Sequence, residues 1–461
     1  MEARSPGSSS ARRSSASGAG SRASDRRSRR RVCRSRPDVG LERADVAVVG
    51  GGPAGATAAA LLARAGLDVV CFERERFPRF HVGESLLPAS TPLFDRVGVG
   101  PRLAAAGFLR KYGAAFFDEG ESREVILNFR AGPTWADHAY NVPRAEFDRL
   151  LLDHAVKEGA RVLEGAEVRD VRIQADGVRL GVAVDGEGPR PVEARFLVDA
   201  SGRDALLASR LGRREPMPGL GRAALFAHYA GGHRWEGRME GHIRVYLFRD
   251  GWFWWIPFAG DVTSVGCVLH RRAVRRGPSL ETLFEDAVAA CPAVARCLAG
   301  ARRVAGVWSA ANFSYRAEPV IADRFVALGD AVTFVDPIFS TGVYVAMQSA
   351  ELAVPAIVEG FRRGEFRAAR FDDYRRRVAV GTGLFFEFID RYYDPAFLDI
   401  FFAPAPPAAL KDAVTTVFAG GGFLERPLWL RLRLAAVRLG VRCVRWRRRW
   451  AGLPVDSRLR W

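Results

Sequence analysis

Lysine is nearly absent from this chain of 461 residues: its 69 basic residues comprise 66 Arg and only Lys111, Lys157 and Lys411. Long apolar runs are missing as well, since no stretch of 18 apolar residues and no apolar core of a secretory signal is present. We therefore expect neither a transmembrane helix nor a secretory signal. Because Arg stays protonated, each remaining Lys is a candidate for chemistry that Arg cannot perform.

Paired cysteines and metal-ligand spacings are also lacking. The six cysteines form no C-x-x-C pair, and the seven histidines are scattered, with His228 and His233 not one helical turn apart. The sequence therefore predicts no metal site and no disulfide framework. This cysteine usage favours a reducing compartment, and we expect a cytoplasmic protein.

Acidic residues are scarce at the two ends of the chain. Residues 1–43 hold 12 Arg and 4 acids, a net charge of +8, and residues 426–461 hold 11 Arg and Asp456, a net charge of +10. The total of +17 leaves 17 − 8 − 10 = −1 for the middle. We interpret 1–43 as a disordered basic tail, although its Arg- and Ser-rich start also matches a transit peptide. No nucleic-acid-binding motif accompanies the charge.

A β-α-β unit stands near the start of the folded part. The apolar run Asp45–Val49 predicts a buried parallel strand, and Gly50, Gly52 and Gly55 follow it in G-x-G-x-x-G spacing before a helix-favouring stretch. The next strand ends at Glu73. Glycines let the backbone approach a pyrophosphate at a helix N-terminus, and an acid at this point can bind ribose hydroxyls. The sequence therefore predicts a dinucleotide site.

Aromatic residues crowd into Gly251–Pro257. If this segment is a strand, Trp252, Trp254 and Ile256 lie on one face and Phe253 and Trp255 on the other. Two interpretations remain open from the residues alone. The segment is a core strand, or one of its faces forms a wall of the cofactor site.

Several motifs resemble those of flavin-dependent halogenases and of the wider FAD monooxygenase superfamily. They are, in chain order, Phe80–Pro88, Phe108–Phe116, Val142–Asp148, Val198–Gly202, Gly251–Pro257, Leu328–Asp330 and Phe334–Val343. The resemblance spans about residues 44–380. It implies that Lys111 is the catalytic residue, that Thr341 and Gly342 bind halide, and that Trp252 and Trp254 separate flavin from substrate. The FAD-binding residues that it implies are Gly50, Gly52, Ala54, Gly55, Glu73, Arg144, Gly329, Asp330 and Val343.

The resemblance also implies a reaction. Reduced FAD from a separate flavin reductase, O2 and chloride or bromide yield hypohalous acid, which Lys111 directs onto an electron-rich ring. Tryptophan halogenases have Glu where this chain has Phe339. We therefore expect a phenol or pyrrole substrate, either free or tethered to a carrier protein. The alternatives are an FAD-dependent monooxygenase or geranylgeranyl-reductase-like enzyme, and a non-catalytic flavin-binding protein associated with a membrane or carrier.

The expected fold is an α/β composite. It comprises an FAD-binding, three-layer Rossmann-like module over 44–380, with an antiparallel substrate sheet formed mainly by 113–140 and 206–315. A helical C-terminal region over 381–461 follows. Its basic, amphipathic end, which includes Trp429, Trp446 and Trp450, could face an acidic carrier protein, an anionic membrane surface or only water.

Overall fold

A computed structural model describes residues 43–131, 135–217, 222–270, 273–274, 279–311, 314–334, 336–423 and 428–455. The interpretation of residues 1–43 as a disordered tail therefore lies outside the described residues, except for Arg43. Within the described ranges, no helix is both long and apolar enough to cross a bilayer.

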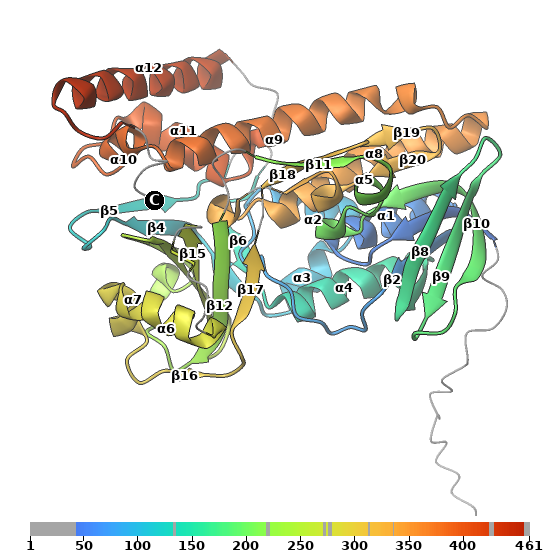
Figure 1. The fold of residues 1–461 in the computed structure, drawn as a ribbon, viewed down its shortest axis with the longest axis horizontal. Coiled ribbons are helices and arrows are strands. Elements are labelled where there is room, and N and C mark those ends of the chain that lie inside the picture. The colour runs from blue at the N-terminus through green and yellow to red at the C-terminus, as the bar shows by residue number, and fades with distance from the viewer. Residues whose placement is uncertain are drawn as a thin grey trace, which may run out of the picture. The chain divides into compact units, whose positions relative to one another are not determined.

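A largely parallel sheet forms one half of the fold (Figure 1). Its strands run in the order β19-β20-β10-β1-β2-β7, and β8 and β9 extend it by antiparallel pairing onto β10. Their bounds are β1 Arg43–Val49, β2 Val69–Glu73, β7 Arg161–Glu164, β8 Ala166–Ile173, β9 Val178–Val184, β10 Arg190–Asp199, β19 Ile321–Ala322 and β20 Phe325–Ala327. The central strands are buried because helices cover the sheet, which explains their continuous apolar runs.

The helices that pack near this sheet carry the cofactor-side residues. Helix α1 contacts both α4 and α8. The bounds are α1 Pro53–Arg64, α2 Ser90–Val97, α3 Gly100–Ala105, α4 Arg144–Lys157, α5 Leu206–Leu211 and α8 Gly342–Arg363. The helix-favouring stretch begins at Ala56, but helix α1 already begins at Pro53. Pro suits the first helical position, because no N–H is needed there.

The second large sheet has the strand order β16-β12-β15-β14-β13-β4-β5, with β17 also paired to β12. Its strands are β4 Gly113–Phe117, β5 Glu124–Asn128, β12 Arg222–Ala230, β13 Ile243–Phe248, β14 Gly251–Pro257, β15 Val262–His270, β16 Arg302–Arg303 and β17 Trp308–Ala311. The expected antiparallel pairing holds except between β13 and β4, which run parallel. The helices α6 Leu280–Ala289 and α7 Pro292–Cys297 contribute to the core on the Trp255 face.

Smaller sheets and the C-terminal helices complete the structure. The small sheets pair β3 Leu109–Lys111 with β6 Ala139–Asn141, and β18 Tyr315–Glu318 with both β11 Arg213–Pro216 and β21 Thr333–Phe334. The C-terminal helices are α9 Asp372–Tyr392, α10 Pro395–Phe401, α11 Ala408–Phe418 and α12 Leu428–Trp450. Helix α9 runs through residue 380 without a break, and α12 packs on α10 and α11 (Figure 1).

Candidate active site

The glycine-rich turn after β1 lies at one end of a cavity of about 680 Å³. Gly50 has a φ of +99°, and a Cβ there would lie 2.3 Å from the carbonyl oxygen of Ala200, so only glycine fits. Gly52 precedes α1 and, with Ala54, lines the cavity. The first turn of α1 therefore presents backbone N–H groups that have no partner within the helix.

Glu73 closes the same end of the cavity. It is buried, and its carboxylate accepts hydrogen bonds from the backbone N–H groups of Gly51 (2.7 Å) and Glu75 (2.9 Å). These bonds fix the carboxylate at the end of β2, beside the glycine turn. The arrangement places an acceptor where a ribose hydroxyl would lie in a dinucleotide site.

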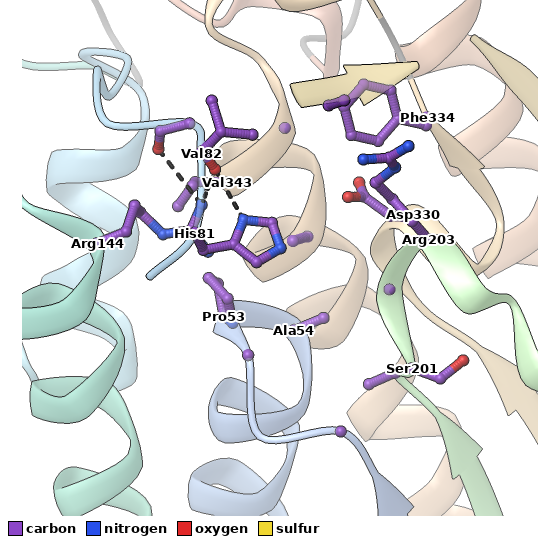
Figure 2. A pocket seen from close by; sticks show the side chains of 18 of the residues that line it. Pro53, Ala54, His81, Val82, Arg144, Ser201, Arg203, Asp330, Phe334 and Val343 are labelled. Carbon is purple, nitrogen blue, oxygen red and sulfur yellow. Dashed lines mark hydrogen bonds between the residues drawn. The ribbon is translucent and has the colours of Figure 1, made fainter. Parts of the chain in front are cut away.

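Arg144, Asp330 and Arg203 also line the cavity, with Arg144 at the left of Figure 2 and Asp330 and Arg203 at the right. Burial raises the pKa of Asp330 to about 7, although Arg144 and Arg203 act in the opposite direction. Figure 2 shows the Arg203 guanidinium beside the Asp330 carboxylate. His81 faces the same space, and burial, reinforced by Arg144, lowers its pKa to about 4, so it is neutral at physiological pH.

Gly55 and Gly329 lie just behind the lining residues. A Cβ at Gly55 would approach the carbonyl oxygen of Gly50 to 1.8 Å. At Gly329, whose φ is +57°, a Cβ would lie 3.1 Å from the Cα of Ala346 and 3.3 Å from the Cβ of Ala54. These two glycines allow the elements around the cavity to pack closely, whereas Gly50, Gly52 and Asp330 line the cavity itself.

The N-terminus of α8 forms another part of the wall. Ser340, Thr341, Gly342 and Val343 all line the cavity, and Ser340 has a left-handed backbone with a φ of +55°. The Thr341 hydroxyl is buried and has no hydrogen-bond partner among the described residues. A Cβ at Gly342 would meet no atom within 4 Å, so open space lies beside this residue. Free N–H groups, the helix dipole and an unpaired hydroxyl together suit a small anion.

Strand β14 supplies the aromatic wall. Trp252, Trp254 and Ile256 line the cavity, while Phe253 and Trp255 belong to the separate core against α6 and α7. The predicted alternation of faces is therefore confirmed. The indole N–H of Trp254 donates to the Ser264 hydroxyl at 3.1 Å, so on this face the polar tip of the ring is satisfied.

Lys111 lies outside the cavity lining, at the end of β3. Its side chain is fully buried, and Nζ donates to Ser85 Oγ (2.9 Å) and to the carbonyl oxygen of Leu86 (3.1 Å). Nζ also lies 5.4 Å from the centre of the Phe129 ring. Burial without a carboxylate partner lowers the pKa of Lys111 to about 7. Ser85 does line the cavity, so one side chain connects Lys111 to the cofactor space.

Sequence reasoning missed two polar groupings at the walls. Glu84 is buried and lines the cavity; one carboxylate oxygen accepts a hydrogen bond from His228 Nε2 at 2.7 Å, and the other has no partner among the described residues. Glu84 lies in the motif Phe80–Pro88, but nothing in the sequence spacing of this motif pointed to His228 on β12.

The second grouping supports the aromatic wall from behind. The indole N–H of Trp252 donates to the Tyr393 hydroxyl (2.8 Å), which donates to the buried carboxylate of Asp336 (3.2 Å). Arg222 lies 3.5 Å from the same carboxylate and 3.4 Å above the Tyr393 ring. Burial raises the pKa of Asp336, although Arg222 acts against it. Tyr393 lies 141 residues from Trp252, so only the fold brings them together.

The cavity fits a flavin dinucleotide. At one end it has the glycine turn, an open helix N-terminus and a fixed carboxylate, which suit a pyrophosphate and a ribose. Its walls also include two indole rings and the N-terminus of α8. The cavity volume also falls within the usual range for a cofactor pocket.

Comparison with known proteins supports this assignment. Residues 43–383 match the family model described as an FAD binding domain. The chain is 35% identical to the 1H-pyrrole-2-carbonyl-[peptidyl-carrier protein] chlorinase of Pseudomonas fluorescens, over 76% of this chain and 83% of the relative. It is 34% identical to flavin-dependent halogenase armH3 of Armillaria mellea, over 74% and 73%. Identity to the tryptophan 2-halogenase of Chondromyces crocatus is 35%, over 73% and 65%.

Solved structures with the same fold include halogenases and a differently described flavoprotein. A flavoprotein/dehydrogenase from Cytophaga hutchinsonii superposes with a TM-score of 0.81 at 28% identity, covering 88% of this chain and 99% of that one. The myxobacterial chondrochloren halogenase superposes with a TM-score of 0.71 at 31% identity, covering 87% and 97%. The sequence relatives decide between these two descriptions: the chain belongs to the FAD-binding-domain family and, within it, to the flavin-dependent halogenases.

Proposed function

We propose that this halogenase acts on an electron-rich pyrrole or phenol ring, with Lys111 as its catalytic residue. One observation carries the proposal. A fully buried Lys, which has no carboxylate partner in the described part of the chain, hydrogen-bonds to Ser85, and Ser85 lines the cavity that fits FAD. A structural Lys would normally be solvent-exposed or paired with an acid, because an isolated buried ammonium is costly.

The cofactor is held by the residues that line the cavity or pack directly behind its lining. Gly50, Gly52, Ala54 and Gly55 form the cradle for the pyrophosphate, and Glu73 binds the ribose. Arg144, Asp330 and Val343 line the same cavity, and Gly329 packs just behind its lining. Bound reduced FAD supplies, together with O2, the oxidising power that converts halide into hypohalous acid. The flavin is reduced by a separate flavin reductase.

Halide binds at the N-terminus of α8. The backbone N–H groups at Thr341 and Gly342 point along the helix dipole, and the unpaired Thr341 hydroxyl adds a donor. Because the space beside Gly342 is open, a chloride or bromide ion fits there without displacing a side chain. Trp252 and Trp254 then separate this oxidising site from the substrate ring and exclude water.

Lys111 holds the hypohalous acid against the substrate. With a pKa of about 7, the side chain exists at neutral pH both as ammonium and as free amine. The ammonium donates a hydrogen bond to the oxygen of hypohalous acid. The free amine can instead attack the halogen, so that an N–halogen bond forms at Nζ, the halogen–oxygen bond breaks, and the hydroxide leaves as water with one amine proton. Nζ has no exposed surface, so neighbouring side chains must move when a ring approaches.

The choice of ring rests on Phe339 and on the relatives. Phe339 is buried among aromatic side chains, with its ring centre 4.4 Å from that of Phe418, so no carboxylate stands at the position that is Glu in tryptophan halogenases. A relative named for a pyrrolyl group on a peptidyl carrier protein supports a carrier-tethered substrate. A relative named tryptophan 2-halogenase makes tryptophan the alternative to be tested.

The test is a reconstituted reaction. Purified protein, FAD, a flavin reductase, NADH, O2 and chloride or bromide are given pyrrole-2-carbonyl carrier protein, free pyrroles, phenols and tryptophan, and products are identified by mass spectrometry. Halogenated pyrrole or phenol that is lost in Lys111→Ala is the expected result. Hydroxylated product, halogenated tryptophan alone, or unchanged halogenation in the variant would contradict the proposal.

A further inference from the structure

Helix α12 has two apolar faces, and among the described residues α10 and α11 cover only one of them. Leu430, Leu434, Val437 and Val441 are buried and face α10 and α11. At 100° per residue, a second stripe lies on the opposite side of the helix. This outer stripe consists of Leu428, Leu432, Leu439, Trp446 and Trp450, whose exposed fractions lie between 62% and 78%. An ordinary surface helix presents polar residues there.

The eight Arg of α12 divide into two sets by their contacts. Arg433, Arg438, Arg445 and Arg448 form ion pairs with acidic residues of α9 to α11 and of the α9–α10 turn: Asp412, Glu387, Asp394 and Asp399, respectively. These four attach the helix to the body. The other four, Arg431, Arg442, Arg447 and Arg449, are exposed and have no acidic partner among the described residues.

The unpaired Arg flank the outer stripe. Arg431, Arg442 and Arg449 are 11 and 7 residues apart, which places them along one flank, and Arg447 lies on the other. Between Leu428 and Val455 the sequence has no acidic residue at all. The outer stripe is therefore an apolar surface bordered by uncompensated positive charge, and its complement is an apolar surface bordered by negative charge.

We propose that the outer stripe of α12 binds the surface of an anionic lipid bilayer. From Leu428 to Trp450 the outer stripe rises over 22 residues and is therefore about 33 Å long, on the convex surface of a single helix. A flat bilayer covers it along its whole length, whereas a folded partner would need a matching groove. Trp rings favour the boundary between acyl chains and headgroups, where Arg reaches the phosphates. Figure 1 shows α12 at the margin of the fold, with α10 and α11 between it and the sheets.

A second copy of the chain is a poorer complement. Pairing two outer stripes would bring together eight unpaired Arg and no acid, so the contact would be repulsive. An acidic protein would pair with the Arg side chains, but its charged surface would not cover the exposed Leu and Trp side chains along the outer stripe. The membrane contact is peripheral, because no described helix is apolar enough to cross a bilayer.

The test is vesicle sedimentation with the full-length protein. Vesicles of phosphatidylcholine with phosphatidylglycerol are expected to bind at least about tenfold more protein than vesicles of phosphatidylcholine alone, and added salt should weaken binding. The stripe variant combines Leu432→Gln, Leu439→Gln, Trp446→Gln and Trp450→Gln. It should lose at least about tenfold in binding. A matched control carries Leu211→Gln and Val304→Gln, which replace exposed apolar residues elsewhere, and should bind normally.

A charge variant separates the contribution of the unpaired Arg to vesicle binding from that of the apolar stripe. Arg431→Gln, Arg442→Gln and Arg449→Gln together should weaken binding to anionic vesicles by at least about tenfold, since each Arg near such a surface contributes about fivefold. The control replaces the exposed Arg130, Arg249 and Arg302 with Gln. All variants should retain bound FAD and halogenating activity on a soluble substrate. Absence of wild-type binding, or wild-type binding by the stripe variant, overturns the proposal. So does a concentration-dependent dimer that the stripe variant abolishes, without vesicle binding.

Discussion

Arg144 and Lys111 are both buried cations within reach of the cofactor cavity, but their surroundings differ. Arg144 donates to both oxygens of Asp148 (2.7 and 2.8 Å) and to the carbonyl oxygen of Val82 (2.6 Å). Lys111 donates only to neutral oxygens, those of Ser85 and Leu86. One buried charge therefore has a carboxylate partner, and the other has none within the ranges that the structure describes.

Under the proposed mechanism, the difference separates a structural charge, Arg144, from a reactive one, Lys111. Burial disfavours the cation at both sites, but at Arg144 the carboxylates of Asp148, Asp330 and Glu84, Asp148 foremost, more than compensate and raise its pKa. At Lys111 burial acts alone and lowers the pKa to about 7. A permanently charged Arg can hold an anionic cofactor and its own carboxylate, whereas a Lys near its pKa can donate or accept a proton during turnover.

The strongest test of this contrast is Lys111→Met. Met fills a similar volume but carries no donor and no nucleophile. We expect halogenation to fall roughly a thousandfold, within the range typical of lost acid–base or nucleophilic groups. FAD binding and the free energy of unfolding should not decrease, because the substitution removes a poorly solvated amine. Product formation by mass spectrometry and flavin titration measure the two effects.

Lys111→Arg is the matched control, because Arg keeps the positive charge but does not release its proton near neutral pH. Arg stays protonated and has no carboxylate to pair with at this site, so we expect it to be as inactive as Lys111→Met and less stable. Activity close to wild type would mean that a fixed cation is sufficient, and the proposed contrast with Arg144 would no longer hold.

Arg144→Met should damage stability and not chemistry alone. It leaves Asp148 buried, with Arg79 at 3.4 Å as its remaining basic neighbour. Breaking a buried ion pair from one side typically costs about 3–5 kcal/mol. We expect the free energy of unfolding, measured by chemical denaturation, to fall by about 3 kcal/mol. FAD binding should also weaken. The double variant with Asp148→Leu removes the stranded carboxylate and should regain part of the stability but not the FAD affinity.

The pH dependence of stability gives a third test of the contrast. The pKa of Lys111 falls from 10.5 to about 7 on folding, so between these values the unfolded chain binds the proton and the folded protein does not. Stability must rise with pH in this window. Relative to Lys111→Met, the wild type should gain about 2 kcal/mol in free energy of unfolding from pH 7 to pH 9. His242, which lies beside this site and whose pKa burial lowers to about 4, does not titrate in this window.

A difference between the two proteins that stays flat from pH 7 to pH 9 would contradict the low pKa. Denaturation of both proteins at matched ionic strength supplies the comparison. As a control, the difference in free energy of unfolding between the wild type and Arg144→Met should not change from pH 7 to pH 9, because Arg144 keeps its proton throughout this range.

The sequence predicted the cofactor half of the fold well because its signals are local. The strand, glycine turn and helix around Gly50 follow one another along the chain, and each has a composition that few other structures tolerate. Helix α8 begins at Gly342, where the motif Phe334–Val343 ends, and runs to Arg363, after which Gly364 ends it in a left-handed conformation. The parallel pairing of β13 with β4 was missed, because strand partners more than a hundred residues apart leave no local pattern.

In the candidate site, too, local motifs pointed to some residues, whereas the neighbours that the fold supplies were not predicted. Lys111, Thr341 and Trp252 were identified from motifs, but their neighbours were not. Tyr393, which supports Trp252, lies at the end of α9, in a region that the sequence described only as helical. Residue spacing can indicate that a Lys is unusual. It cannot indicate that no carboxylate lies next to it, because that depends on how distant segments pack.

The smallest predicted effect extends the contrast from unpaired charges to unpaired hydroxyls. Thr341 and Thr57 both have buried hydroxyls without a partner among the described residues, but only Thr341 lines the cavity. Thr341→Val should raise the KM for chloride or bromide about tenfold, since a hydrogen bond to a charged group contributes about 1.5 kcal/mol. Thr57→Val, on α1, should leave the halide KM unchanged and leave the free energy of unfolding equal or higher. Steady-state kinetics with varied halide measure both variants. Equal halide KM values would show that the Thr341 hydroxyl is merely a buried polar group like that of Thr57, and the halide site would then consist of backbone N–H groups alone.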